Sequence, residues 1–513
     1  MSNSSNSCYH GVAAIAAVVG VAAVVVFLVR SVQVKPFIPS LTMPVHLHRV
    51  VVGVVDFFGS VEGLGRITFD EADQDGMCQF YVMGSRFISV LKAEHVRTVV
   101  NASSFRRRER FFDTFVEAVV GEKALIQVMG NEWKLHRNLV AKALGWQNLV
   151  SMAPVMGSLS NEFATVLLAT KGPSVDVVPL LKHLTLDIIG ATSFGKSFGA
   201  IQKAECPVAD AFKFLLNDLS RRRVQDPLSP ASSFYWIPTA ANKMYHRQSA
   251  ILRATIDQVV ASRLRPVHNA DGTMPVHQDL LQYLVDAAKE EASGVTRQSF
   301  ADNLLTFLFG GYDTTSTALA YALHLVAANP RVQENAILEI HQVLGPTDMP
   351  TYDSISKLTY CAAVITESLR LFPPVHVTMR TLETDLDVGG HHVPKDTNVL
   401  LPIYWIHRFE ANWGPDADAF RPERHLGDGE DDHVQIHAKD KAFRMMAFSG
   451  GPRSCVGFRF AMMEAVIALV VILRRCKLSV PADAPSVRPV VAGIVTKPEH
   501  GVWLHVEPRD SST

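Results

Sequence analysis

A single cysteine in a glycine-rich loop is the strongest chemical feature of this sequence. The loop reads Phe448-Ser-Gly-Gly-Pro-Arg-Ser-Cys-Val-Gly457, and a long apolar stretch over residues 458–474 follows it directly. The apolar stretch predicts a helix, whose N-terminus together with Arg453 would favour the thiolate form of Cys455. A thiolate on a rigid loop suits an axial ligand of haem iron in an enzyme that cleaves dioxygen. A buried, unreactive cysteine is the alternative for a cysteine taken alone.

A second pattern could bind the acidic groups of a haem. Trp133 and Arg137 are four residues apart, so they would share one face of a helix. A buried haem has two propionates to neutralise, and an indole N–H and a guanidinium are suitable donors. A core tryptophan beside an exposed arginine would have the same spacing.

A third pattern interrupts a predicted long apolar helix over residues 300–328. Gly310-Gly-Tyr-Asp-Thr-Thr315 lies in its middle, where each glycine costs ~1 kcal/mol of helix stability. Threonine side chains there can also bond to preceding carbonyls and bend the helix. The pattern indicates either a packing glycine pair or a widened turn at a dioxygen site, where Asp313 and Thr314 manage protons.

A charged pair lies in a predicted helix that ends before Pro373-Pro374. Glu367 and Arg370 are three residues apart and can pair across one turn. An exposed pair of this kind contributes only ~0.3–0.5 kcal/mol, whereas breaking a buried network costs ~3–5 kcal/mol. The sequence alone leaves both possibilities open.

These four patterns together resemble the cytochrome P450 family of haem-thiolate monooxygenases. The cysteine loop fits FxxGxRxCxG at every fixed position, and the other patterns fit the WxxxR, (A/G)GxDT and ExxR elements of the family. The resemblance extends from about residue 45 over nearly the whole chain. It departs from the usual pattern at His425, where the family generally has an aromatic residue. His at position 313 is usual in sterol 14α-demethylases, and Glu at 310 in fatty-acid ω-hydroxylases that esterify their haem; Asp313 and Gly310 argue against both subtypes.

The resemblance implies a mainly α fold with a smaller β region, and a role for each matching residue. The cofactor would be haem b (iron protoporphyrin IX), with Cys455 as the iron ligand. The implied cofactor-binding residues are Cys455, Trp133, Arg137, Arg380, Arg453, Phe448, Gly451 and Gly457. Thr314 and Asp313 would be catalytic, and Glu367, Arg370 and Arg424 would form a structural network behind the loop.

The N-terminus predicts a membrane anchor. Residues 11–29 are uninterruptedly apolar, no acidic residue, lysine or arginine precedes Arg30, and Lys35 follows. A span of ~20 residues crosses a bilayer, and the flanking charges would keep the rest of the chain cytosolic. A cleaved signal peptide is the alternative, which the position of the charges disfavours. We therefore expect a tail over residues 1–10, an anchor over 11–29, a proline-containing linker over 30–48 and a catalytic domain over 49–508, on the endoplasmic reticulum membrane.

The composition limits the classes of ligand and partner that this chain would bind. The chain of 513 residues has 49 basic and 50 acidic residues, which argues against nucleic acid. Its six cysteines contain no CxxC pair, so neither a zinc site nor a disulfide framework is indicated, and a reducing compartment is favoured. No flavin or nucleotide motif is present, so the resemblance implies electrons from a separate NADPH-cytochrome P450 reductase, with cytochrome b5 as a second candidate donor.

The expected substrate is a lipophilic small molecule, with a sterol or a fatty acid as leading candidates. The alternatives are a xenobiotic-oxidising monooxygenase, a haem-thiolate isomerase or dehydratase that uses no oxygen, and a non-catalytic haem sensor. Further expected elements are a hairpin near residues 80–90, a helix at 93–100, long helices over 211–266 with a proline-containing break at 226–230, and a hairpin over 385–402.

Overall fold

The computed structural model describes most of the chain beyond residue 60. It covers residues 61–70, 72–82, 85–102, 117, 119–203, 206–225, 236–264, 279–282, 284–285, 296–345, 348–427, 439–492 and 495–509. The expected anchor and linker, and the proline-containing break expected after residue 225, lie outside these residues.

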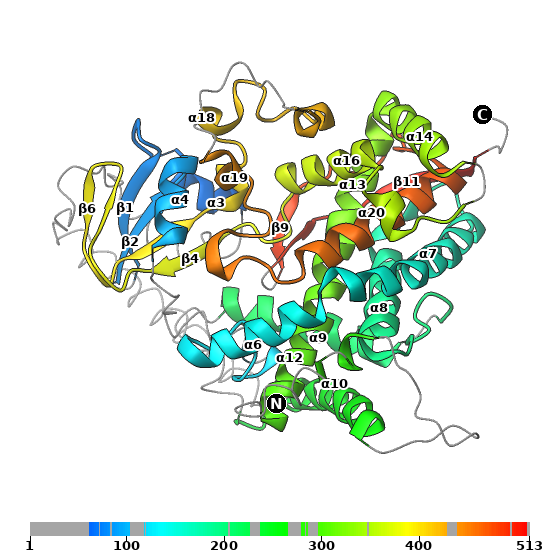
Figure 1. Cartoon of the computed structure of the whole chain (residues 1–513), viewed down its shortest axis with the longest axis horizontal. Coiled ribbons are helices and arrows are strands. Elements are labelled where there is room, and N and C mark those ends of the chain that lie inside the picture. Colours follow the sequence, from blue (N-terminus) through cyan, green and yellow to red (C-terminus); the bar gives the residue numbers. More distant parts are fainter. Residues whose placement is uncertain are drawn as a thin grey trace, which may run out of the picture.

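Helices make up the larger part of the structure (Figure 1). The long helices are α4 (Ala93–Asn101), α6 (Gly130–Ala143), α7 (Trp146–Ala169), α8 (Val177–Phe194), α9 (Pro207–Gln225), α10 (Ala240–Leu264), α12 (Arg297–Phe309), α13 (Thr315–Ala328), α14 (Pro330–Leu344), α16 (Thr359–Leu371) and α20 (Phe458–Arg475). The short ones are α3 (Val61–Thr68), α15 (Tyr352–Ile355), α17 (Ile403–Ile406), α18 (Glu410–Trp413), α19 (Lys441–Arg444), the π-helical turn η2 (Gly310–Thr314) and the 3₁₀ turns η3 (Pro422–His425) and η4 (Gly451–Arg453).

The strands of the described part of the chain form four small sheets. The strands are β1 (Met77–Val82), β2 (Ser85–Val90), β3 (Val175–Asp176), β4 (Thr378–Thr381), β5 (Leu386–Val388), β6 (His391–Val393), β7 (Asn398–Leu401), β8 (Cys476–Ser479), β9 (Pro489–Ala492), β10 (Val495–Pro498) and β11 (Trp503–Pro508). The largest sheet has the order β1-β2-β7-β4 and lies beside α3 and α4, at the left of Figure 1. Among the described strands of this sheet, β2 and β7 alone pair in parallel, with Ile88 opposite Val399.

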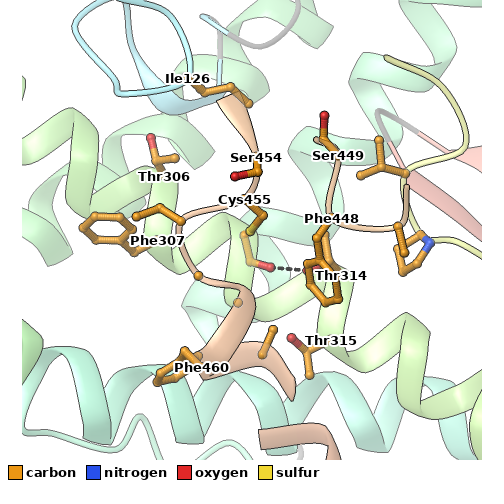
Figure 2. Close-up of a pocket in the computed structure, with 18 of the residues that line it drawn as sticks. Ile126, Thr306, Phe307, Thr314, Thr315, Phe448, Ser449, Ser454, Cys455 and Phe460 are labelled. Atoms are coloured by element: carbon orange, nitrogen blue, oxygen red, sulfur yellow. Dashed lines mark hydrogen bonds between the residues drawn. The ribbon is translucent and has the colours of Figure 1, made fainter. Parts of the chain in front are cut away.

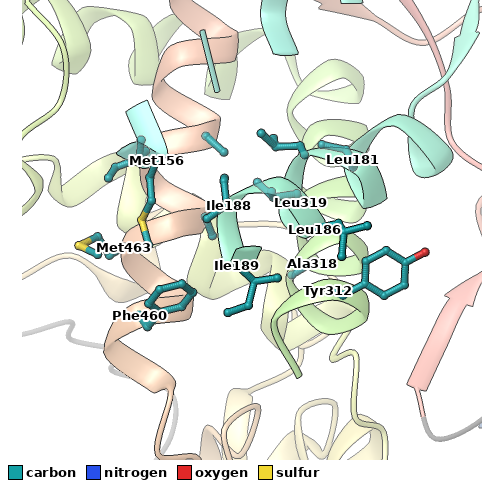
Figure 3. Close-up of a cluster of buried hydrophobic side chains, with 14 of the residues drawn as sticks. Met156, Leu181, Leu186, Ile188, Ile189, Tyr312, Ala318, Leu319, Phe460 and Met463 are labelled. Carbon is teal, nitrogen blue, oxygen red and sulfur yellow. The ribbon is translucent and has the colours of Figure 1, made fainter. Parts of the chain in front are cut away.

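The main core lies where α7, α8, α13 and α20 meet. Figure 3 shows Ile188 and Ile189 of α8 between Phe460 and Met463 of α20 on one side and Ala318 and Leu319 of α13 on the other. Among the described residues, α8 alone is long and apolar enough to cross a membrane, and 67% of that window is buried inside the protein. Its apolarity therefore fits a core helix.

The expected fold class is confirmed: the chain is mainly α with a smaller β region. The hairpin expected near residue 85 is the antiparallel pair β1–β2, and the helix expected at 93–100 is α4. The hairpin expected over 385–402 is only partly right. It consists of β5 and β6 alone, while β7 leaves it to pair with β2 and β4 in the largest sheet.

Candidate functional site

The cysteine loop is fixed by its own backbone and by contact with α4. The Cys455 N–H donates to the Phe448 carbonyl oxygen at 2.8 Å, which closes the loop. Gly451 has φ +68°, and a Cβ there would lie 2.4 Å from the Val100 carbonyl oxygen of α4. Only glycine allows both the left-handed backbone and this close approach. Gly451 therefore supports the loop from behind and does not line the cavity.

Cys455 faces a cavity of about 380 Å³. Its side chain is open to that cavity, although protein surrounds it on the remaining sides. This burial raises the pKa of the thiol, against a hydrogen bond from the Gly457 backbone and the positive charge of Arg137. A metal cation bound to the sulfur would offset this rise in pKa and stabilise the thiolate, because a coordinating thiol is deprotonated.

The charge that reaches the cysteine comes from Arg137 and not from the neighbouring Arg453. Arg137 donates to the carbonyl oxygen and the hydroxyl of Ser454. Arg453 instead turns its guanidinium over the Trp133 ring, 4.2 Å from the centroid, and donates to the Val128 carbonyl oxygen at 3.1 Å.

Four side chains that can donate hydrogen bonds line this cavity. Its lining includes Trp133, Arg137, Arg380 and Arg453 together with Phe448, Cys455 and Gly457. Arg380 is buried and donates to the Ser449 hydroxyl at 3.2 Å. The described residues that line the cavity include three arginines and no carboxylate. An apolar cavity with this charge suits a flat apolar group with acidic substituents, and the haem with its two propionates fits that description.

A π-helical turn faces the cysteine loop. The expected widened turn is present as η2, between α12 and α13. Thr314 and Thr315 line the cavity beside Cys455 and Phe448 (Figure 2). The Thr314 hydroxyl donates to the Gly310 carbonyl oxygen at 2.6 Å, so its orientation is fixed. π turns inside α-helices are frequent at functional sites.

Asp313 lies away from the cavity. Its carboxylate is fully buried, and Oδ1 accepts from Lys182 Nζ of α8 at 2.5 Å. The described lining of the cavity does not include Asp313. The structure thus brings Thr314, but not Asp313, to the wall of the cavity that Cys455 faces.

Glu367, Arg370 and Arg424 form the buried network that the family resemblance implied. The Arg370 guanidinium donates twice to Glu367, at 2.7 and 2.8 Å. Arg424 Nε donates to Glu367 Oε1 at 3.0 Å, and its other nitrogens bind Asp416. The side chains of all three network members are fully buried.

His425 completes this network, a role that sequence reasoning missed. Its Nε2 lies 2.8 Å from Glu367 Oε2. Burial raises the pKa of Glu367, but the hydrogen bonds from Arg370 and His425 outweigh it and lower that pKa to about 2. The unusual histidine in place of an aromatic residue was the available signal, since a donor placed near a buried carboxylate stabilises it.

His407 connects the network to the cysteine loop and was also missed. The imidazole is fully buried, Nδ1 lies 2.9 Å from the Arg370 carbonyl oxygen, and Nε2 accepts from the Met446 N–H at 2.7 Å. Burial lowers the pKa of His407 to about 3, so the ring is neutral and Nδ1 carries the proton.

The comparisons with known proteins agree with this geometry. The family model described as Cytochrome P450 matches residues 69–505. The chain is 30% identical to a cytokinin hydroxylase of Arabidopsis thaliana, over 76% of this chain and 72% of that protein. It is 26% identical to Cytochrome P450 4V2 of Mus musculus (82% and 80% covered) and to Cytochrome P450 3A12 of Canis lupus familiaris (74% and 75% covered).

Proposed function

Because this chain belongs to the cytochrome P450 family of haem-thiolate monooxygenases, we propose that it hydroxylates a lipophilic small molecule. A sterol or a fatty acid is the leading substrate class. Electrons come from a separate NADPH-dependent reductase, with cytochrome b5 as a second candidate donor. A single N-terminal span over residues 11–29 anchors the chain to the endoplasmic reticulum membrane, with the catalytic domain in the cytosol.

The wall of the cavity carries the proposal for a lipophilic substrate. Most of the lining side chains outside the cysteine loop are apolar, among them Leu125, Ile126, Ile189, Leu280, Phe307 and Val375. Besides Trp133, Arg137 and Arg380, the polar side chains outside the loop are the hydroxyls of Thr306, Thr314, Thr315 and Thr378. The three arginines are all engaged at or beside the loop. A neutral, apolar part of a substrate would therefore enter this space, since an isolated carboxylate would be costly there.

Each site residue has a role in the proposed reaction that follows from its position. Haem b, held by Cys455, supplies the activation of dioxygen. Trp133, Arg137, Arg380 and Arg453 bind the propionates. Thr314 holds a proton at Oγ1 on the cavity wall. Asp313, paired with Lys182 behind the turn, is the second residue of proton delivery.

Exposed basic side chains near the loop would receive an acidic redox partner. Lys134, Lys441 and Arg459 are exposed and lie on α6, α19 and α20, the helices that flank the cysteine loop. Arg444 is half-buried because its guanidinium stacks over Trp413, 4.5 Å from the ring centroid. Complementary charge of this kind raises association rates more than affinity.

A titration of the purified ferric protein tests the substrate class. A panel of sterols, fatty acids, a cytokinin and neutral xenobiotics is added while the Soret band reports loss of the water ligand. We expect saturable shifts with a sterol or a fatty acid, followed by ¹⁸O incorporation from ¹⁸O₂ that depends on NADPH and reductase. Turnover without oxygen would support an isomerase or dehydratase, and binding without any turnover would support a sensor.

A pair of cysteine variants tests the haem ligand. Cys455→Ser should lose the thiolate signature of the reduced carbon monoxide complex. Cys361→Ser is the matched control, because Cys361 is buried on α16 and does not line the cavity. A thiolate signature that survives in Cys455→Ser would refute the assignment.

A further inference from the structure

Helix α8 contacts the π turn through one of its faces. Lys182, Thr185 and Ile189 are spaced three and four residues apart, so their side chains lie on the same side of the helix. They meet three consecutive residues of the turn in antiparallel order: Ile189 with Gly311, Thr185 with Tyr312, and Lys182 with Asp313. Each of these three α8 side chains thus contacts one residue of the turn.

Thr185 supplies a hydrogen bond that a widened turn needs. A π turn shifts the usual helical pairing, so buried carbonyls there require other donors. The fully buried Thr185 hydroxyl donates to the Tyr312 carbonyl oxygen at 2.8 Å. Ser316, from α13, donates to the same oxygen at 2.7 Å. The Tyr312 carbonyl oxygen therefore has one hydroxyl donor from the helix that follows the turn and one from α8.

Lys182 fixes the next residue along the turn. Its Nζ bonds the fully buried Asp313 carboxylate and lies 5.4 Å from the centroid of the Tyr312 ring. Breaking a pair of this kind leaves a buried charge without compensation, which is strongly unfavourable. The ion pair therefore resists any movement of the turn away from α8.

Ile189 prevents movement in the opposite direction. A Cβ at Gly311 would lie only 2.8 Å from Ile189 Cδ1, whereas a Cβ at Gly310 would meet nothing within 4 Å. The turn is thus in tight contact on the α8 side and has space on the other.

We propose that Lys182, Thr185 and Ile189 are positioning residues that fix the π turn and, through it, the Thr314 hydroxyl. Two bonds hold the turn towards α8 and one steric contact limits its approach, so the turn has one position. Thr314 then keeps its bond to the Gly310 carbonyl oxygen at the cavity wall. The catalytic consequence rests on the proposed monooxygenase function, while the effect on the turn does not.

Hydrogen exchange of the haem-loaded protein tests the effect on the turn. Thr185→Val keeps the shape of the side chain and removes the hydroxyl, and Thr185→Ser restores the donor. We expect backbone amides in peptides covering residues 305–320 to exchange about tenfold faster in Thr185→Val, with Thr185→Ser close to wild type. Peptides of α20 should exchange at the wild-type rate in both variants. Equal acceleration in α20 would show a general loosening of the core and would overturn the proposal, as would no acceleration at residues 305–320.

The coupling of oxygen consumption to product formation tests the catalytic consequence. With the panel compound that gives the largest spin-state shift, Thr185→Val should form several-fold less product per O₂ consumed, with KM unchanged. Lys182→Met should act in the same direction, and Thr185→Ser should restore coupling. Unchanged coupling alongside accelerated exchange would overturn the link to Thr314. If no compound is hydroxylated, the proposed function fails, yet the exchange experiment still decides whether α8 positions the turn.

Discussion

Replacing His425 with phenylalanine tests how the buried carboxylate of Glu367 is stabilised. His425 Nε2 lies 2.8 Å from Glu367 Oε2, and an ionised carboxylate only accepts, so Nε2 is the donor. A hydrogen bond to a charged group contributes ~1.5–3 kcal/mol. A phenylalanine ring occupies similar space, so the variant removes the donor without opening a cavity. We expect His425→Phe to lower the free energy of unfolding by ~2 kcal/mol at neutral pH.

The loss should depend on pH in a defined direction. The pKa of Glu367 is lowered from 4.5 to about 2 in the folded protein. A difference of this size corresponds to about 3 kcal/mol of stability, present above pH ~4.5 and lost as the pH falls towards 2. Without His425 the folded pKa rises towards its ordinary value. The stability difference between wild type and His425→Phe should therefore shrink as the pH falls below ~4.5.

Urea unfolding of the haem-loaded protein, followed by circular dichroism at pH 7 and pH 3, measures both effects. His425→Gln is the matched control, because its amide can donate to the same oxygen, and it should recover at least half of the loss. A change below ~0.5 kcal/mol at pH 7, or the same loss in the Gln and Phe variants, would refute the reasoning. A negligible loss in the Phe variant with a full loss in the Gln variant would instead indicate that His425 acts through its edge-on ring contact with Trp413, at 6.1 Å between centroids, which phenylalanine can keep.

Two further predictions concern the loop and the helix that follows it. Gly451→Ala should lose haem during purification because its Cβ would lie 2.4 Å from the Val100 carbonyl oxygen, whereas Gly450→Ala, whose Cβ would meet the flexible Met446 Sδ at 3.3 Å, should retain it. Equal haem content by pyridine haemochrome assay would contradict this. Burial raises the pKa of the fully buried Glu464 well above its ordinary value, so the folded state keeps a proton that the unfolded chain releases, and folding weakens as the pH rises above ~4.5. Glu464→Gln should therefore unfold at a higher temperature than wild type, by a margin that grows from pH 5 to pH 8; a constant margin would show that Glu464 is ionised.

Local patterns predicted the elements whose contacts are close in sequence. The cysteine loop, the β1–β2 hairpin and helix α4 each have a spacing that one segment shows by itself. The widened turn was predictable for the same reason, because two glycines and two threonines lie inside one apolar run. In each case one short segment carried the whole signal, such as the helix-destabilising glycines of the turn.

Contacts between distant segments were not predictable from such patterns. Asp313 matches a family element, but its carboxylate faces Lys182 because α8 packs behind the turn, and no local spacing shows that packing. β7 follows the β5–β6 hairpin in sequence, yet it pairs with β2, about 310 residues earlier. His425 was visible as an unusual residue, and only the fold shows that the carboxylate beside it belongs to Glu367.

One neutral imidazole explains how the buried ion network supports the cysteine loop. Arg370 donates to the His407 carbonyl oxygen, and the His407 ring donates back to the Arg370 carbonyl oxygen, so the two backbones are joined twice. The other ring nitrogen accepts the Met446 N–H, and the Met446 carbonyl oxygen accepts the Ser449 N–H at the start of the loop. Protonation of His407 would remove that acceptor, and its low pKa, caused by burial, prevents this across the physiological range. Glu367 and Arg370 thus support the loop by fixing backbone positions. The His407 side chain, which links them to the loop, carries no charge.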